Sequence, residues 1–137
     1  MPRLNALAKS FSPSQSDSIF MPGYVDDALI DRLYETCFLF AMPSIGEGFG
    51  LVYLEAMSRA KPCVGAKVDA TPLIVGDGVT GLLVEDPRSP DQVADAIIWL
   101  MAHPEDANAM GRAGYDLVRS RYLFPHFQER FWRAIAD

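Results

Sequence analysis

Short apolar runs alternate with amphipathic stretches along most of this chain. Four runs have the length and continuity of strands buried in a parallel sheet: Ser18–Pro22, Phe38–Met42, Pro62–Ala66 and Gly81–Val84. The residues between and after them repeat apolar positions at helical spacing, and Asp or Pro marks several expected helix starts. This alternation predicts a three-layer α/β domain with a mainly parallel sheet of about four strands.

The expected helices begin near residues that favour a first helical turn. They are Asp27–Thr36, one opening near Gly50, a short one at Thr71–Pro72, Pro90–Met101, Glu105–Tyr122 and Phe127–Ala136. The last of these carries a heavy aromatic face made by Phe124, Phe127, Phe131 and Trp132. Such a face is more often part of a hydrophobic core than of a ligand-binding site. If its partner surface is missing, the rings are exposed and favour association.

These patterns divide the chain into three parts. We expect a polar N-terminal segment over residues 1–18, an α/β domain over 19–122 and a C-terminal aromatic helix over 123–137. A chain of 137 residues is long enough for one domain with a core of its own.

The stretch from Met42 to Ala66 has the most informative order of elements. A strand ends at Pro43, a loop with three glycines follows, a helix opens near Gly50, and a second strand begins at Pro62. Strand, glycine loop, helix and strand form a βαβ unit, which places the loop at the carboxyl edge of the sheet. Ligands of open α/β sheets bind at that edge.

Two acids frame this loop, Glu47 within it and Glu55 in the second turn of the expected helix. The free backbone amides of Gly50–Val52 offer partial positive charge to an anion, and Gly48 and Gly50 permit close approach of the backbone. Amides flanked by two hydroxyl-accepting carboxylates suit a sugar diphosphate better than a bare phosphate. The alternative is a simple glycine-rich turn, with Glu55 as a solvated helix residue.

Several motifs in this region occur together and in a fixed order. They are Pro43-Ser44, Glu47-Gly48-Phe49-Gly50-Leu51, Glu55-Ala56-Met57, Pro62 and Asp77-Gly78-Val79-Thr80-Gly81-Leu82-Leu83-Val84. In this combination the chain resembles the C-terminal domain of GT-B retaining glycosyltransferases, the large group with a Glu-x7-Glu signature. The resemblance covers roughly residues 19–101 and implies a Rossmann-like fold.

The resemblance implies a role for each residue that matches the signature. Glu47 is the catalytic position, accepting hydrogen bonds from donor-sugar hydroxyls, and Glu55 accepts from the ribose. Donor contacts are expected over Glu47–Val52, namely Glu47, Gly48, Phe49, Gly50, Leu51 and Val52. Tyr24, Val25 and Ser44 are candidates for contact with the nucleotide base, and a Tyr24 that closes the core is an equal alternative. The donor is expected to be linked to UDP or GDP, with no metal or other cofactor.

The sequence also departs from the pattern of that group. Asp69 and Ala70 stand where two glycines are usual, and Leu73 replaces a glutamate that opens a helix. Nothing in the chain matches an N-terminal acceptor domain, and Arg3 and Lys9 match no cationic motif for the diphosphate. We therefore expect a donor-binding part that is incomplete alone, a hexosyltransferase if an N-terminal domain completes it.

The strand at Ser18–Pro22 either pairs with Phe38–Met42 or leaves an exposed edge, and such an edge favours self-association.

A second function from another class stays open. The same departures favour a catalytically inert Rossmann-like module for interaction or assembly. A dinucleotide-dependent oxidoreductase is disfavoured, because Gly46-Glu47-Gly48-Phe49-Gly50 does not match Gly-x-Gly-x-x-Gly.

Composition narrows the remaining classes. The net charge of −6 disfavours a nucleic-acid partner. No run has the length of a transmembrane segment and no signal core is evident, so a cytoplasmic location is expected. His103 and His126 are isolated, which argues against a metal site, and Cys37 and Cys63 are expected to be buried free thiols.

Overall fold

The computed structural model describes residues 2–136 of the chain. Over this range the elements, in order, are α1 (Pro2–Ala8), α2 (Pro13–Ser16), α3 (Asp27–Thr36), β1 (Phe40–Ala41), α4 (Leu51–Met57), β2 (Cys63–Ala66), α5 (Thr71–Ile74), β3 (Gly81–Val84), α6 (Pro90–Ala102), α7 (Pro104–Arg121) and α8 (Phe124–Ala136). The chain forms two compact units, one up to Arg32 and one from Leu33 onward.

The first unit contains short helices and no buried residue among those described. Asp26 caps α3 as expected, since its Oδ1 accepts a hydrogen bond from Leu29 N at 2.8 Å. The predicted strand at Ser18–Pro22 is wrong: this segment joins no ladder, and Phe20 is 70% exposed. Apolar residues alone do not make a strand, which needs a neighbour to pair its backbone groups.

The second unit is built on a parallel sheet of three strands in the order β1-β2-β3. Cys63 lies between Phe40 of β1 and Gly81 of β3 in the register of the ladder. Pairing continues just past β1, because Met42 N donates to Val64 O at 3.0 Å. The sheet is therefore α/β and parallel, as predicted, with one strand fewer than the expected four.

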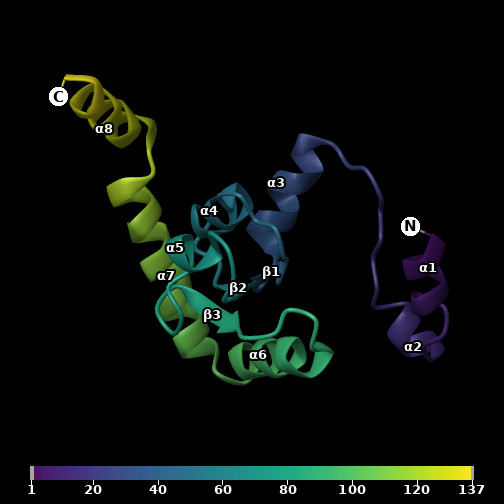
Figure 1. Cartoon of the computed structure of the whole chain (residues 1–137). Coiled ribbons are helices and arrows are strands. Elements are labelled where there is room, and N and C mark those ends of the chain that lie inside the picture. The colour runs from purple at the N-terminus through teal and green to yellow at the C-terminus, as the bar shows by residue number, and fades with distance from the viewer. Residues whose placement is uncertain (1, 137) are drawn as a thin grey trace. The chain divides into compact units, whose positions relative to one another are not determined.

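Helices cover both faces of this sheet, which confirms a three-layer domain. On one face α4, α5 and the end of α7 pack in a cluster that includes Tyr53, Met57 and Val118. On the other face α6 and the start of α7 pack against alternate strand residues such as Val64 and Val84. Figure 1 shows α4 and α6 on opposite sides of the sheet.

Helix α8 differs from its prediction at its start. It begins at Phe124, so Pro125 lies in its first turn, where the missing N–H costs nothing, and does not break the helix. Of the two alternatives for its aromatic face, the core is not the one observed: Phe124, Phe127 and Trp132 are 68%, 55% and 61% exposed, as expected of a face without a partner surface. The rings of this face contact one another instead, with Phe127 and Phe131 stacked at 6.0 Å.

Both cysteines are free thiols, as predicted. Cys63 is buried in β2 and Cys37 is half-buried. Burial raises the pKa of the Cys63 thiol to about 12, so this group stays protonated and unreactive at neutral pH.

Candidate functional site

The loop between β1 and α4 is shaped by glycines and by the side chain of Glu47. Gly50 precedes α4 with a left-handed φ of 85°, a conformation that glycine adopts at little cost because it has no Cβ. Glu47 Oε1 accepts a hydrogen bond from Gly50 N at 2.9 Å. The carboxylate of Glu47 thus lies at the start of α4, and the Gly50 amide, expected to be open to an anion, is already engaged by it.

Tyr53 fixes α4 against the end of β1. Its side chain is fully buried, and its hydroxyl donates to the carbonyl oxygen of Met42, just before the loop. Gly65 makes room for this ring, because a Cβ there would lie 2.7 Å from Thr71 Cγ2 and 3.2 Å from the Tyr53 oxygen. Burial raises the pKa of the Tyr53 phenol, which therefore stays a hydrogen-bond donor.

Glu55 lies on the exposed side of α4 and has a partner on α3. The Tyr34 hydroxyl donates to Glu55 Oε2 at 3.0 Å, and the Arg59 guanidinium lies 5.5 Å from the centre of the Tyr34 ring. Burial, and next the hydrogen bond to Glu55, raise the pKa of Tyr34, so its phenol stays protonated. No signal in the sequence alone links Tyr34 to a residue 21 positions away.

Replacing Tyr34 by phenylalanine tests this contact. We expect Tyr34→Phe to lower the free energy of unfolding by about 1 kcal/mol, because one hydrogen bond to a carboxylate is lost while the ring contact with Phe40 remains. Urea denaturation measures the change. Tyr115→Phe is the matched control, since the Tyr115 hydroxyl accepts a hydrogen bond from exposed Arg119 on its own helix. Equal changes in the two variants would contradict the role given to Tyr34.

The loop after β2 lies against the loop that carries Glu47. Asp69 Oδ2 accepts from Gly46 N at 2.6 Å, and Ala70 N donates to Glu47 O at 3.4 Å. Asp69 and Ala70 are the residues that stand where two glycines were expected. The Asp69 side chain therefore adds a contact between the two loops.

The rest of the loop is open. Gly48 has no atom within 4 Å of the position of a Cβ, and Phe49 and Leu51 are 50% and 62% exposed. The Phe49 ring meets the edge of Tyr122 at 6.5 Å. The hydroxyl oxygen of Ser44, by contrast, is buried and faces away from solvent.

Tyr24 and Val25, the other two candidates for base contact, lie in the first unit. Tyr24 is 98% exposed, so the alternative in which it closes the core is wrong.

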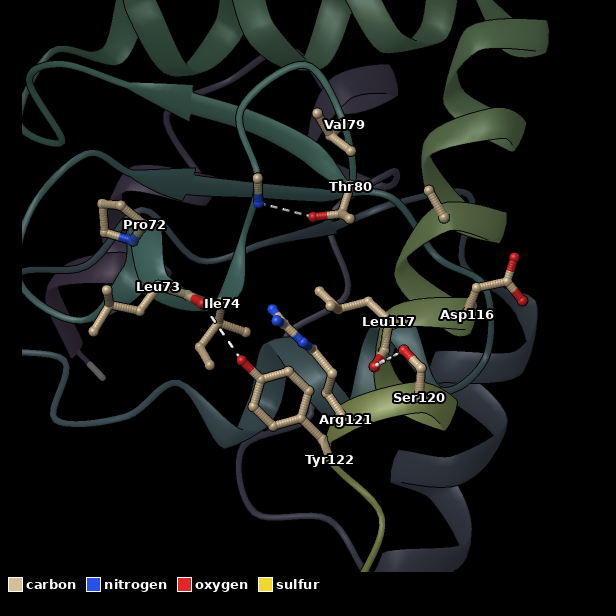
Figure 2. A pocket seen from close by; sticks show the side chains of 12 residues that line it. Pro72, Leu73, Ile74, Val79, Thr80, Asp116, Leu117, Ser120, Arg121 and Tyr122 are labelled. Atoms are coloured by element: carbon tan, nitrogen blue, oxygen red, sulfur yellow. Dashed lines mark hydrogen bonds between the residues drawn. The ribbon is translucent and has the colours of Figure 1, made fainter. Parts of the chain in front are cut away.

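A groove of about 520 Å³ opens between α5, the turn before β3 and α7. Figure 2 shows the Arg121 side chain reaching into it beside Ile74 and Leu117. Tyr122 forms one wall and contacts Leu73 O at 3.5 Å, so the groove borders α5. No motif in the sequence pointed to this groove.

Lys67, which directly follows β2, is paired with Glu85 at 2.7 Å. Within residues 2–136 no cluster of three or more acidic, Cys or His side chains could hold a metal ion. None of the helices over the same range is both long and apolar enough to cross a membrane.

A sequence model of the family described as "Glycosyl transferases group 1" matches residues 5–117, which is most of the chain. The chain belongs to this family. The chain is similar to D-inositol 3-phosphate glycosyltransferase of Segniliparus rotundus, with 37% identity over 122 residues, covering 89% of this chain and 25% of that protein. The chain thus spans about a quarter of the length of this curated relative.

Solved structures support the same assignment. Sucrose-phosphate synthase from Thermosynechococcus elongatus matches with a TM-score of 0.84 and 26% identity, over 98% of this chain and 34% of the other. The C-terminal domain of a group 1 glycosyl transferase (LpcC) from Francisella tularensis matches with a TM-score of 0.76 and 29% identity, over 90% and 64%. This group 1 chain therefore has the fold of part of a GT-B C-terminal domain, as its motifs predicted.

Proposed function

We propose that this chain is the donor-binding part of a retaining glycosyltransferase and binds a nucleotide sugar linked to UDP or GDP. The observation that carries the proposal is the placement of Glu47 and Glu55 on either side of the start of α4. Glu47 is held there by the Gly50 amide, and Glu55 is held one and a half turns later by Tyr34. Both carboxylates keep acceptor capacity for hydroxyl groups.

Each carboxylate has a distinct task in this proposal. Glu47 accepts hydrogen bonds from hydroxyls of the donor sugar, close to the bond that breaks. Glu55 lies about 7 Å farther along the helix axis from Gly50 and accepts from the ribose. The two acids together select a ligand with hydroxyls at both ends and anionic groups between them.

The diphosphate is the part of the donor that needs positive partial charge. In the resting structure Glu47 occupies the Gly50 amide. When the donor binds, Glu47 turns to the sugar, and the released Gly50 amide joins those of Leu51 and Val52 in stabilising charge on the departing diphosphate. The proposed chemistry uses no metal or cofactor, and an N-terminal domain supplies the acceptor surface.

Nucleotide binding tests the proposal. Calorimetric titration of the chain with UDP, GDP, UDP-glucose and GDP-mannose should detect one nucleotide class. We expect Glu55→Ala to weaken its binding by at least about tenfold, because a hydrogen bond from ribose to a charged group is lost. Asp95→Ala, which removes an exposed carboxylate on α6, is the control and should bind like the wild type. No heat with any of the four ligands would contradict the proposal.

One observation favours a second function, assembly with another protein surface. The aromatic face of α8, formed by Phe124, Phe127, Phe131 and Trp132, is exposed in the described structure. This function predicts that Glu55→Ala leaves association unchanged, whereas Trp132→Ala weakens it. Analytical ultracentrifugation of the two variants separates the functions.

A further inference from the structure

The loop that carries Glu47 is bonded at Gly46 to Asp69, a residue of the loop that follows β2. Asp69 Oδ2 accepts from Gly46 N at 2.6 Å, across 23 positions of sequence. The neighbouring Ala70 N reaches Glu47 O at 3.4 Å, a longer and weaker bond. The bond from Asp69 is short and charge-assisted, so it is the stronger of the two ties between these loops.

The backbone conformation of Asp69 is one that aspartate adopts more easily than most other residues. Its φ is 53°, in the left-handed region that favours glycine. Asp reaches this region at lower cost than most residues, because its short side chain bonds locally. The chain thus keeps the backbone shape of the glycine expected at this place and adds a carboxylate to it.

Two carboxylates therefore hold the same loop at both ends. Asp69 holds Gly46 N and Glu47 holds Gly50 N, while both glycines have left-handed φ angles of 87° and 85°. Gly48, between them, has no neighbour within 4 Å of a Cβ position. The bond from Asp69 is the shorter of the two bonds that join this loop to the loop after β2.

We infer that Asp69 is a positioning residue that sets where the Glu47 carboxylate lies. This inference rests on the proposed donor binding. Asp69 acts through the loop backbone, so its loss displaces Glu47 and leaves Glu55, which is held by Tyr34, in place. Recognition of the donor sugar then weakens, and recognition of the nucleotide does not.

Two variants separate the carboxylate from the backbone shape. Asp69→Gly keeps the left-handed conformation and removes the acceptor, whereas Asp69→Asn keeps an acceptor oxygen and removes the charge. Hydrogen exchange of the Gly46 amide, followed by NMR, reports the bond directly. We expect Asp69→Gly to speed this exchange about tenfold and Asp69→Asn to restore most of the protection. Unchanged exchange in Asp69→Gly would overturn the inference.

Titration with paired ligands tests the consequence for binding. The ligand pairs are UDP-glucose with UDP and GDP-mannose with GDP. We expect Asp69→Gly to weaken binding of the sugar-bearing ligand about tenfold and binding of the bare nucleotide less than about twofold. Asp69→Asn should restore most of the binding affinity for the sugar-bearing ligand. A merely structural role would weaken both ligands alike, and that result, or no loss at all, would overturn the positioning role.

The two proposals fail in different ways. If the wild type binds none of the four ligands, the donor-binding function falls and the positioning of a donor-reading carboxylate falls with it. Gly46 exchange then still shows whether Asp69 anchors the loop. If the wild type binds both members of a pair and Asp69→Gly changes neither, donor binding stands and only the inference about Asp69 fails.

Discussion

Gly111→Ala should lower the free energy of unfolding by about 3 kcal/mol, although alanine normally favours a helix over glycine by about 1 kcal/mol. Gly111 lies in α7 against the turn that follows α4. A Cβ at this position would lie 2.1 Å from Ala60 O and 3.4 Å from Pro62 Cδ. Because the first of these is a backbone atom, the helix itself must move away. Thermal and urea denaturation measure the loss.

Gly114→Ala is the matched control for this prediction. It lies three residues later on the same helix and gains the same helix propensity. Its Cβ would lie 2.9 Å from Met57 Cγ and 3.3 Å from Met57 Cβ, so the Met57 side chain must shift, whereas no backbone atom is as close. We expect a clearly smaller loss than for Gly111→Ala. Equal stability of the two variants would show that α7 does not approach the turn as closely as described.

Tyr53→Ala should be at least as damaging, with a loss of about 3–5 kcal/mol, typical of a buried aromatic truncated to alanine. Tyr53 packs edge-on against Phe40 at 5.7 Å between ring centres and is fully buried. Many domains have only about 5–15 kcal/mol of stability in total. The variant should therefore be largely unfolded at moderate urea concentrations, as circular dichroism would show.

Tyr53→Phe separates the ring from its hydroxyl. It keeps the packing and removes the donor to Met42 O, so we expect a loss of about 1–2 kcal/mol. Tyr122→Phe is the control, because its hydroxyl makes only a long contact of 3.5 Å to Leu73 O. If Tyr53→Phe cost no more than this control, the end of β1 would not depend on the hydroxyl.

The sequence predicted the second unit well because its signals are local and agree with one another. Continuous apolar runs marked β2 and β3, and Pro90 marked the start of α6. The order of strand, glycine loop and helix also placed Glu47 beside the start of α4. Local patterning suffices where each element packs against its chain neighbours.

The errors arose where structure depends on a partner that a pattern does not show. The run at Ser18–Pro22 has strand-like composition but no ladder, and the aromatic face of α8 has core-like composition but no cover in the described structure. The sequence also gave no sign that Glu47 engages the Gly50 amide, because a side-chain rotamer carries no pattern. The same holds for the contacts of Tyr34 and Asp69, which join residues more than 20 positions apart.

The hydrogen bond between Glu47 and Gly50 has a consequence for the proposed donor binding. The Gly50 amide is already bonded to the Glu47 carboxylate, so a diphosphate bound as proposed would compete with this tethered group at high local concentration. The observed dissociation constant then equals the intrinsic one divided by the fraction of molecules whose glutamate has swung aside. Under the proposed donor binding, a ligand whose hydroxyls bond the displaced carboxylate is therefore favoured over a simple phosphate.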